Sequence, residues 1–177
     1  MAGYERLRLF CALRLPPETL ERLALWQAAA LRGGRAVTRQ NLHLTLAFLG
    51  FRAVSEVPAI AGALRDAAAG SGALRLRVCG YRETRNVGML TFEDEGGRAT
   101  ALAGRLHESL ELLGVYEREA RPWLPHVTVL RFGERPHLRP ELPGLADLAP
   151  SDAAVFISRL RPGGAVYEAI EAVPLGG

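Results

Sequence analysis

Two short segments of the chain carry the same polar pattern inside an apolar setting. The first is NLHLTLAFLG, residues 41–50, and the second is PHVTVLRFG, residues 125–133. Each contains a histidine and a threonine two positions apart, and each runs eight residues from the histidine to a glycine. A single His-x-Thr sequence in a strand is usually structural. Two matched copies, which use half of the four histidines of the chain, indicate a shared function.

Strand geometry explains the spacing of the polar residues. On a β-strand, residues i and i+2 point to the same face, about 6.5–7 Å apart. His43 should therefore share a face with Thr45, and His126 should share a face with Thr128. The residues between them should enter the core, namely Leu44, Leu46, Phe48, Val127 and Val129.

Two imidazoles and two hydroxyls lining one cleft are suited to in-line displacement at phosphorus. Hydroxyls can donate hydrogen bonds to the non-bridging phosphate oxygens. One imidazole can take the proton of an attacking water while the other protonates the leaving alkoxide, and each role is typically worth ~10²–10⁴-fold in rate. Symmetry alone does not say which histidine is the acid.

Other chemistries are less compatible with the sequence. No carboxylate flanks either motif histidine, and two histidines with two threonines make a poor zinc shell, so we expect no metal and no cofactor. All 22 cationic residues are arginine, which excludes Schiff-base and P-loop lysines and suits a phosphate ligand. We expect His107 to lie on the surface or in packing, and His137 in a solvated loop.

Length and composition indicate a globular protein. The chain has 177 residues, of which 49% are hydrophobic and 23% charged, and this predicts one domain over residues 1–177 with a sizeable core. Cys11 and Cys79 lie in apolar stretches without CxxC spacing, so we expect buried thiols in a reducing compartment. No apolar run approaches the ~20 residues of a membrane span, and the charged N-terminal stretch is unlike a signal peptide. We expect a cytoplasmic monomer with no membrane association.

Strand and helix patterns alternate along the chain. Pro16 and Pro17 open the first helix, and Ser55 is a candidate N-cap for the second. The expected strands cover 6–14, 42–49, 74–81, 87–92, 126–132, 153–160 and 165–173, and the expected helices begin near 17, 56 and 99 and end before 33, 70 and 114. The pattern is typical of an α+β fold with internal duplication, in which the two His-x-Thr strands meet at the centre of two similar lobes.

These segments resemble a known family. The opening strand RLFCALRLP, the two motifs with the proline before His126, and the closing segment SRLRPGGAVYEAI are similar to those of the 2H phosphoesterases. Within these, the chain resembles the RNA 2′,3′-cyclic phosphodiesterase branch, also called 2′-5′ RNA ligases. The resemblance implies a bilobal α+β fold, with two lobes related by a pseudo-two-fold axis, antiparallel sheets lining a central cleft, and helices outside.

The resemblance also implies an activity. It implies metal-independent hydrolysis of an RNA-terminal ribose 2′,3′-cyclic phosphate to a 2′-phosphate, together with reverse 2′-5′ RNA ligation. By position, His43 would donate a proton to the 3′ oxygen and His126 would accept one from water. Thr45 and Thr128 would hold phosphate oxygens. The expected partners are RNA ends with a 2′,3′-cyclic phosphate, tRNA fragments among them, or cyclic nucleotides.

Several features of the sequence allow more than one interpretation. Arg131 matches a motif arginine near the phosphate, but simple alternation puts it on the face opposite His126, so either the strand bulges after Leu130, or the side chain reaches around the edge, or it is a surface charge. Phe10, Trp123 and Tyr167 could stack on a base, although core packing is the usual role of such residues. Two alternative functions remain: a phosphoesterase for a small cyclic or 2′-5′ nucleotide, and a non-catalytic RNA-end binding protein.

Overall fold

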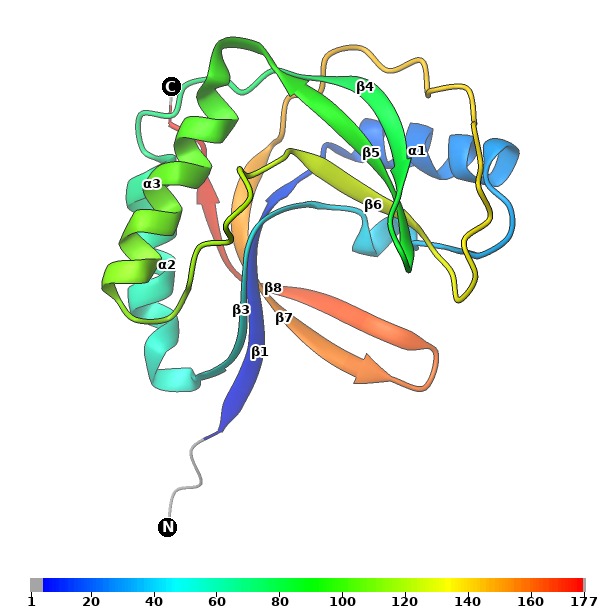
Figure 1. Cartoon of the computed structure of the whole chain (residues 1–177). Coiled ribbons are helices and arrows are strands. Elements are labelled where there is room, and N and C mark those ends of the chain that lie inside the picture. Colours follow the sequence, from blue (N-terminus) through cyan, green and yellow to red (C-terminus); the bar gives the residue numbers. More distant parts are fainter. Residues whose placement is uncertain (1–4, 177) are drawn as a thin grey trace.

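A computed structural model describes residues 5–176, whose strands form one sheet (Figure 1). The strand order is β4-β5-β6-β3-β1-β7-β8, and β2 pairs with β6 outside this path. The strands are β1 (Arg6–Arg14), β2 (Arg35–Ala36), β3 (Leu44–Ala53), β4 (Leu76–Glu83), β5 (Val87–Asp94), β6 (His126–Arg131), β7 (Asp152–Arg161) and β8 (Gly164–Pro174). The α-helices are α1 (Pro17–Ala30), α2 (Val57–Ala68) and α3 (Arg98–Leu112), and the 3₁₀ helices are η1 (Arg39–Asn41), η2 (Val54–Glu56) and η3 (Glu95–Gly97).

The sheet consists of two halves that meet at the motif strands. One half contains β4, β5, β6 and β2, and the other contains β3, β1, β7 and β8. The halves are joined by one antiparallel pair, Leu44 opposite Val127. This arrangement confirms the α+β fold with two lobes, and it places the His-x-Thr strands side by side at the centre.

The two faces of the sheet differ in what they bury. The outer face carries the main core, to which Leu44 and Val127 both belong, and all three helices contribute residues to it. Figure 1 shows α2 and α3 side by side on one lobe, with α1 behind the strands of the other. The inner face carries a much smaller cluster, made of Phe10, Ala12, Ala154 and Phe156 with Tyr167 packed against it.

Most element boundaries agree with the sequence-based expectation, but the start of α2 does not. Ser55 is exposed, lies within η2, and makes no cap hydrogen bond. Glu56 instead accepts a hydrogen bond from the backbone N–H of Ala53 at 2.7 Å, and Pro58 needs no donor partner in the first turn of the helix. The prediction of Ser55 as the N-cap is therefore wrong.

The cysteines also differ from expectation. Cys11 is buried, and burial raises the pKa of its thiol to about 12. Cys79 is exposed, so the prediction of a buried thiol is wrong there. The reason is strand alternation, because Leu76 and Val78 pack on the core while Arg77 and Cys79 are exposed.

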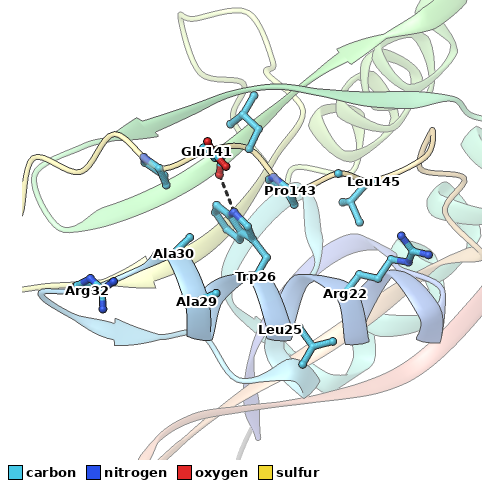
Figure 2. A pocket seen from close by; sticks show the side chains of 12 residues that line it. Arg22, Leu25, Trp26, Ala29, Ala30, Arg32, Glu141, Pro143 and Leu145 are labelled. Carbon is cyan, nitrogen blue, oxygen red and sulfur yellow. Dashed lines mark hydrogen bonds between the residues drawn. The ribbon is translucent and has the colours of Figure 1, made fainter.

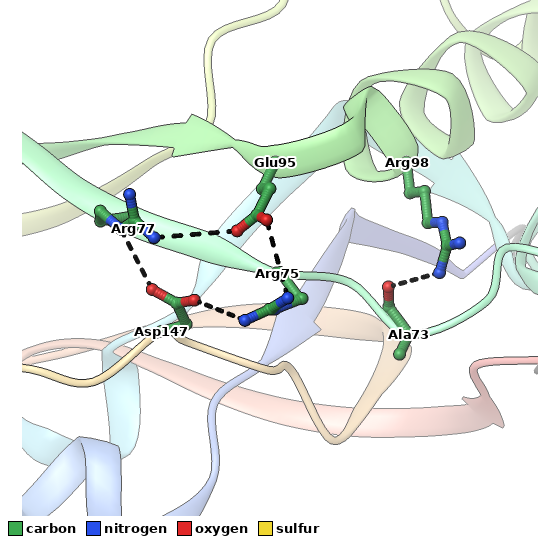
Figure 3. A network of polar contacts seen from close by, with 6 residues as sticks. All are labelled: Ala73, Arg75, Arg77, Glu95, Arg98 and Asp147. Atoms are coloured by element: carbon green, nitrogen blue, oxygen red, sulfur yellow. Dashed lines mark hydrogen bonds and ion pairs between the residues drawn. The ribbon is translucent and has the colours of Figure 1, made fainter.

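The long connection from β6 to β7 returns across the free edge of β4. Leu148 forms a bridge with Leu76, and Asp147 accepts hydrogen bonds from Arg75 at 3.0 Å and from Arg77 at 3.2 Å (Figure 3). The two arginines also face Glu95 at 3.6 Å and 3.8 Å. Hydrogen bonding from Arg77 holds the pKa of Asp147 below its usual value. The network covers an edge that would otherwise expose unpaired backbone.

The same connection packs across α1. The indole N–H of Trp26 donates a hydrogen bond to the carbonyl of Glu141 at 2.8 Å, and a shallow groove lies between the helix and residues 140–145 (Figure 2). This groove is on the outer side of the molecule, because α1 packs through Leu23 against the core face of the sheet. Among residues 5–176, no helix has the length and apolarity needed to cross a lipid bilayer.

Candidate active site

The two motif histidines are held in the same way. His43 Nδ1 lies 2.7 Å from the carbonyl oxygen of Asn41, and His126 Nδ1 lies 2.8 Å from the carbonyl oxygen of Leu124. A carbonyl oxygen can only accept, so Nδ1 carries the proton in both rings. In the neutral form each ring therefore presents an unprotonated Nε2, and the Nε2 of His43 accepts from the hydroxyl of Thr45 at 2.9 Å.

The four polar motif side chains face the inner side of the sheet. Leu44 and Val127 pair with one another and are fully buried in the outer core, so their neighbours on either side point away from it. Electrostatics agrees with this placement, because the charges of His126 and Arg131 both lower the pKa of His43. The structure thus brings together the side chains that the sequence predicted to line one cleft.

A β-bulge in each motif strand sets the direction of the side chains beyond the threonine. On β3, Thr45 and Ala47 lie opposite the consecutive residues Ala12 and Cys11, so Leu46 is extra. Leu46 and Ala47 both enter the core, and Phe48 turns to the inner face, where it is 53% exposed. The prediction that Phe48 is a core residue is therefore wrong, because a bulge shifts strand alternation by one residue.

The bulge on β6 lies at the equivalent position and settles the direction of Arg131. Thr128 and Leu130 lie opposite the consecutive residues Met89 and Gly88, which makes Val129 the extra residue. Arg131 then pairs with Val87, which lies on the same face of β5 as Met89, the partner of Thr128. Arg131 therefore points to the inner face, as Thr128 does. Of the three alternatives for Arg131, the bulge is correct, although it precedes Leu130 rather than following it.

Each bulge is held by a buried polar side chain from a helix. His107 of α3 donates from Nε2 to the carbonyl of Leu46 at 2.7 Å, and Gln27 of α1 donates from Nε2 to the carbonyl of Val129 at 2.8 Å. The two residues are only 5% and 3% exposed. We expected His107 to lie on the surface or in packing, and the structure confirms packing. Its ring centroid also lies 4.9 Å from that of Tyr116. His137 is an exposed loop residue, which confirms the expectation of a solvated loop histidine.

His43 lies against the aromatic cluster of the inner face. Its ring centroid is 4.8 Å from that of Phe10 and 5.3 Å from that of Tyr167, which meets it edge-on. Burial is the main reason that the pKa of His43 falls to about 4, and the charges of His126 and Arg131 lower it further. The hydrogen bond to Asn41 acts in the opposite direction. In the free protein, His43 is therefore neutral at pH 7.

The three aromatic residues considered for base stacking have structural contacts. Phe10 is fully buried and stacks on Phe156 at 5.0 Å, so it has no free face for a base. Trp123 donates its indole N–H to the carbonyl of Thr45 at 3.1 Å, which links the segment before β6 to β3. Tyr167 is half-buried and packs against Phe10 and His43.

Comparison with known proteins identifies the family. The model of the 2′-5′ RNA ligase superfamily matches residues 15–160 of the chain. The chain belongs to the 2′-5′ RNA ligase superfamily. This confirms the resemblance to 2H phosphoesterases that the paired motifs indicated.

Two relatives in this superfamily are named RNA 2′,3′-cyclic phosphodiesterase. The protein from Thermus thermophilus is 36% identical, over 97% of this chain and 91% of its own length. The protein from Escherichia coli K12 is 33% identical over 129 residues, which cover 70% of this chain and 71% of that protein.

Solved structures of the superfamily share the fold. The crystal structure of E. coli LigT in its apo form superposes with a TM-score of 0.83 at 27% identity, covering 98% of this chain and 99% of LigT. A T. thermophilus protein gives a TM-score of 0.81 at 33% identity, covering 97% and 99%. LigT complexed with 3′-AMP gives 0.83 at 25% identity, covering 98% and 100%.

Sequence reasoning missed the side chains that hold the motif strands in place. Asn41 both accepts from His43 through its carbonyl and donates through Nδ2 to the carbonyl of Ala165 at 2.7 Å, so it fixes the ring relative to β8. Gln27 lies among the apolar residues of α1, and an amide on the buried side of a helix could have indicated a buried hydrogen bond. Arg35, which lies directly opposite Arg131, belongs to a two-residue strand with no periodicity that could reveal it.

Proposed function

We propose that this protein hydrolyses a 2′,3′-cyclic phosphate at the end of an RNA strand to a 2′-phosphate, using His43 and His126 as acid and base. The observation that carries this proposal is the matched fixing of both rings through Nδ1, which leaves two unprotonated Nε2 atoms on one face of the sheet. Two threonine hydroxyls and Arg131 share that face.

The proposed reaction is a single in-line displacement at phosphorus. The Nε2 of His126 takes a proton from a water molecule, and the water oxygen forms a bond to phosphorus. The bond from phosphorus to the 3′ oxygen breaks, and that oxygen takes a proton from the Nε2 of protonated His43. The products are a 3′-hydroxyl and a 2′-phosphate. Proton exchange with solvent then returns both imidazoles to their starting states.

His43 must be protonated to donate, although its pKa in the free protein is about 4. A bound phosphate supplies the negative charge that raises this pKa, because an anion nearby favours the cationic imidazolium. The acid form of His43 therefore develops with the substrate in place. Coupling protonation to binding in this way suits a general acid that acts only on a phosphate.

The charge on the phosphate can be held by this chain's own donors. Thr45 and Thr128 supply hydroxyls, and Arg131 supplies a guanidinium that suits phosphate oxygens. We propose that these three residues bind substrate and that no metal takes part. The names of the two relatives, RNA 2′,3′-cyclic phosphodiesterase, support this substrate class. Location in the cytoplasm and a monomeric state stay predictions.

The first test is turnover of an oligoribonucleotide that ends in a 2′,3′-cyclic phosphate, in the presence of EDTA. We expect an RNA ending in a 2′-phosphate, identified by chromatography against 2′- and 3′-phosphate standards. His126→Ala should abolish this product. His137→Asn, at a loop histidine with φ of 56°, is the matched control because asparagine tolerates that conformation.

The outcomes separate the remaining functions. A 3′-phosphate product would contradict the proposed leaving group, and loss of activity with EDTA would contradict the two-histidine mechanism. Binding of the RNA without turnover would support a non-catalytic RNA-end binding protein. 2′-5′ ligation uses the same displacement with a 5′-hydroxyl in place of water: the 5′ oxygen bonds to phosphorus, the 3′ oxygen leaves, and a 2′-5′ diester results. It should be detectable with a 2′,3′-cyclic phosphate end and a 5′-hydroxyl end at high concentration.

A further inference from the structure

Two arginines lie directly opposite one another at the end of the second motif strand. In the antiparallel pairing of β2 with β6, Arg35 is the register partner of Arg131, and Ala36 is the partner of Leu130. The N–H of Val37 donates to the carbonyl of Val129 at 3.1 Å and fixes this register at the bulge. Directly opposite residues project from the same face with Cβ atoms about 4.5–5.5 Å apart, so Arg35 shares the inner face with Arg131.

This placement of two like charges is unfavourable in the free protein. Both side chains are exposed, and among residues 5–176 neither has a carboxylate oxygen within 4.0 Å. Like charges directly opposite one another on a sheet repel. Arg14, at the far end of β1, is by contrast paired with Asp152. An anion bound between Arg35 and Arg131 would offset the repulsion.

Arg35 also reaches the other lobe of the molecule. Its Nη1 donates to the carbonyl of Gly163, in the turn between β7 and β8, at 3.4 Å. Gly164 has φ of +122°, and a Cβ atom there would lie 3.4 Å from Nη2 of Arg35. The guanidinium therefore lies in van der Waals range of this turn, at the point where the two lobes approach one another.

The two arginines lie at the end of the second motif strand, away from His126. The charge of Arg131 lowers the pKa of His43. Arg35 lies on β2, which pairs with the end of β6, beyond the point where β3 pairs with it. In an RNA strand, the next negative charge is carried by the phosphate attached to the 5′ oxygen of the ribose that bears the cyclic phosphate. A nucleoside 2′,3′-cyclic phosphate lacks that second charge.

We propose that Arg35, beside Arg131, forms a subsite for the phosphate on the 5′ side of the terminal nucleotide. This inference rests on the proposed function and names its substrate class. The site then recognises two successive phosphates of an RNA strand rather than a single cyclic phosphate on a nucleoside. Arg131 contacts the reacting phosphate, and Arg35 contacts the next one.

The test uses one pair of small substrates, adenosine 2′,3′-cyclic phosphate with and without a 5′-phosphate. In the wild type the 5′-phosphate should raise kcat/KM about tenfold, mainly through KM, as expected for one exposed charge-assisted hydrogen bond. Arg35→Gln should abolish this gain and leave the substrate without a 5′-phosphate within about twofold of wild type, since that substrate makes no contact with Arg35. Arg35→Lys, which keeps the charge without the planar fork, should retain part of the gain.

Arg65→Gln is the matched control, because Arg65 is also exposed and lies on α2, outside the inner face. It should leave the gain from the 5′-phosphate intact. If Arg35→Gln lowers kcat/KM equally for both substrates, or for neither, the subsite is wrong.

A binding measurement keeps the subsite testable if the wild type turns over neither small substrate. Lack of turnover of the cyclic-phosphate oligoribonucleotide as well would contradict the proposed function alone. The probe is a 3′-phosphorylated diribonucleotide, bound at several salt concentrations. Arg35→Gln should weaken binding about tenfold and reduce the slope of log K against log salt by about 0.7, the value for one phosphate contact on a single strand. Equal affinities and equal slopes in wild type and variant would overturn the inference.

Discussion

The two His-x-Thr strands are alike in backbone and different in surroundings. In both, the histidine donates from Nδ1 to the carbonyl two residues earlier, and the third residue after the histidine is extra in a bulge. In both, the carbonyl of that extra residue accepts from a buried helix side chain. Symmetry of this kind places two imidazoles on one face of the sheet, one from each lobe.

The differences begin at the residue five positions after each histidine. β3 places Phe48 on the inner face, and β6 places Arg131 there. The rings differ as well, because His43 packs against Phe10 and Tyr167 and has a pKa of about 4. The comparison teaches that repeated backbone geometry positions the two Nε2 nitrogens alike, while the side chains around them give the two rings different surroundings.

The largest effect should come from removing either ring. His43→Ala and His126→Ala should each lower kcat by about 10³-fold, since each removes one proton transfer. The double variant should lose little more than either single variant, because the two groups act in one step. Stopped assays on the cyclic-phosphate oligoribonucleotide measure all three.

A sulfur substituent distinguishes the acid from the base. A substrate with sulfur in place of the 3′ oxygen has a leaving group that needs no proton, so it should restore activity to His43→Ala and not to His126→Ala. Restoration in His126→Ala alone would reverse the assignment of roles. Unfolding of both variants should resemble that of the wild type in urea, which excludes loss of fold as the cause.

The next effect tests the asymmetry at the fifth position. Arg131→Gln should lower kcat/KM about tenfold to a hundredfold, because a charged donor to the phosphate is lost. Phe48→Gln should change it by less than about threefold, since the residue is 53% exposed and its ring lies 5.4 Å from that of Phe10. Equal losses in the two variants would contradict the asymmetry and point to a structural role for this position.

The sequence predicted the parts of the site that depend on strand periodicity. The shared face of His43 and Thr45 depends only on positions before the bulge, so simple alternation was sufficient. Phe48 and Arg131 come after the bulge, and alternation misplaced the first and left the second open. A bulge changes only the local register with the neighbouring strand, and no residue type at Leu46 or Val129 signals it.

Residues supplied by other elements were not predictable in the same way. Gln27, Asn41 and His107 act through contacts with residues far away in the chain, and such contacts depend on how the lobes pack. The overall architecture was predictable because it depends on hydrophobic patterns over whole strands and helices. Most boundaries were correct for the same reason, whereas the single cap at Ser55 depended on one local hydrogen bond.

A smaller effect should come from the side chains that hold the two bulges. Gln27→Leu and His107→Phe each remove a buried donor to a bulge carbonyl, which should cost about 1–3 kcal/mol in the free energy of unfolding. Urea denaturation measures this cost. Gln40→Leu, at an exposed glutamine of η1, is the matched control and should be close to neutral.

Kinetics of these variants should separate the two halves. Gln27→Leu disturbs the strand that carries Arg131, so its loss should appear mainly in KM. His107→Phe disturbs the strand that follows His43, so its loss should appear mainly in kcat. If both variants lose stability while kcat and KM stay at wild-type values, the two side chains stabilise the fold without positioning the motifs.

The smallest change should be in the titration of His43. The proposed acid is active only when protonated, and the pKa of His43 in the free protein is about 4. We therefore expect kcat/KM to fall as the pH rises above about 4. In the kcat profile this fall should lie at higher pH, because the bound phosphate raises the pKa.

The charge of Arg131 should be visible in the same titration. Arg131→Gln removes a cation that lowers the pKa of His43, so in an NMR titration the ring should titrate at higher pH in the variant than in the wild type. Phe48→Gln adds and removes no charge and should leave the titration almost unchanged. If the ring titrates at the same pH in Arg131→Gln as in the wild type, Arg131 does not influence His43 across the cleft, and the two strands are independent rather than electrostatically coupled.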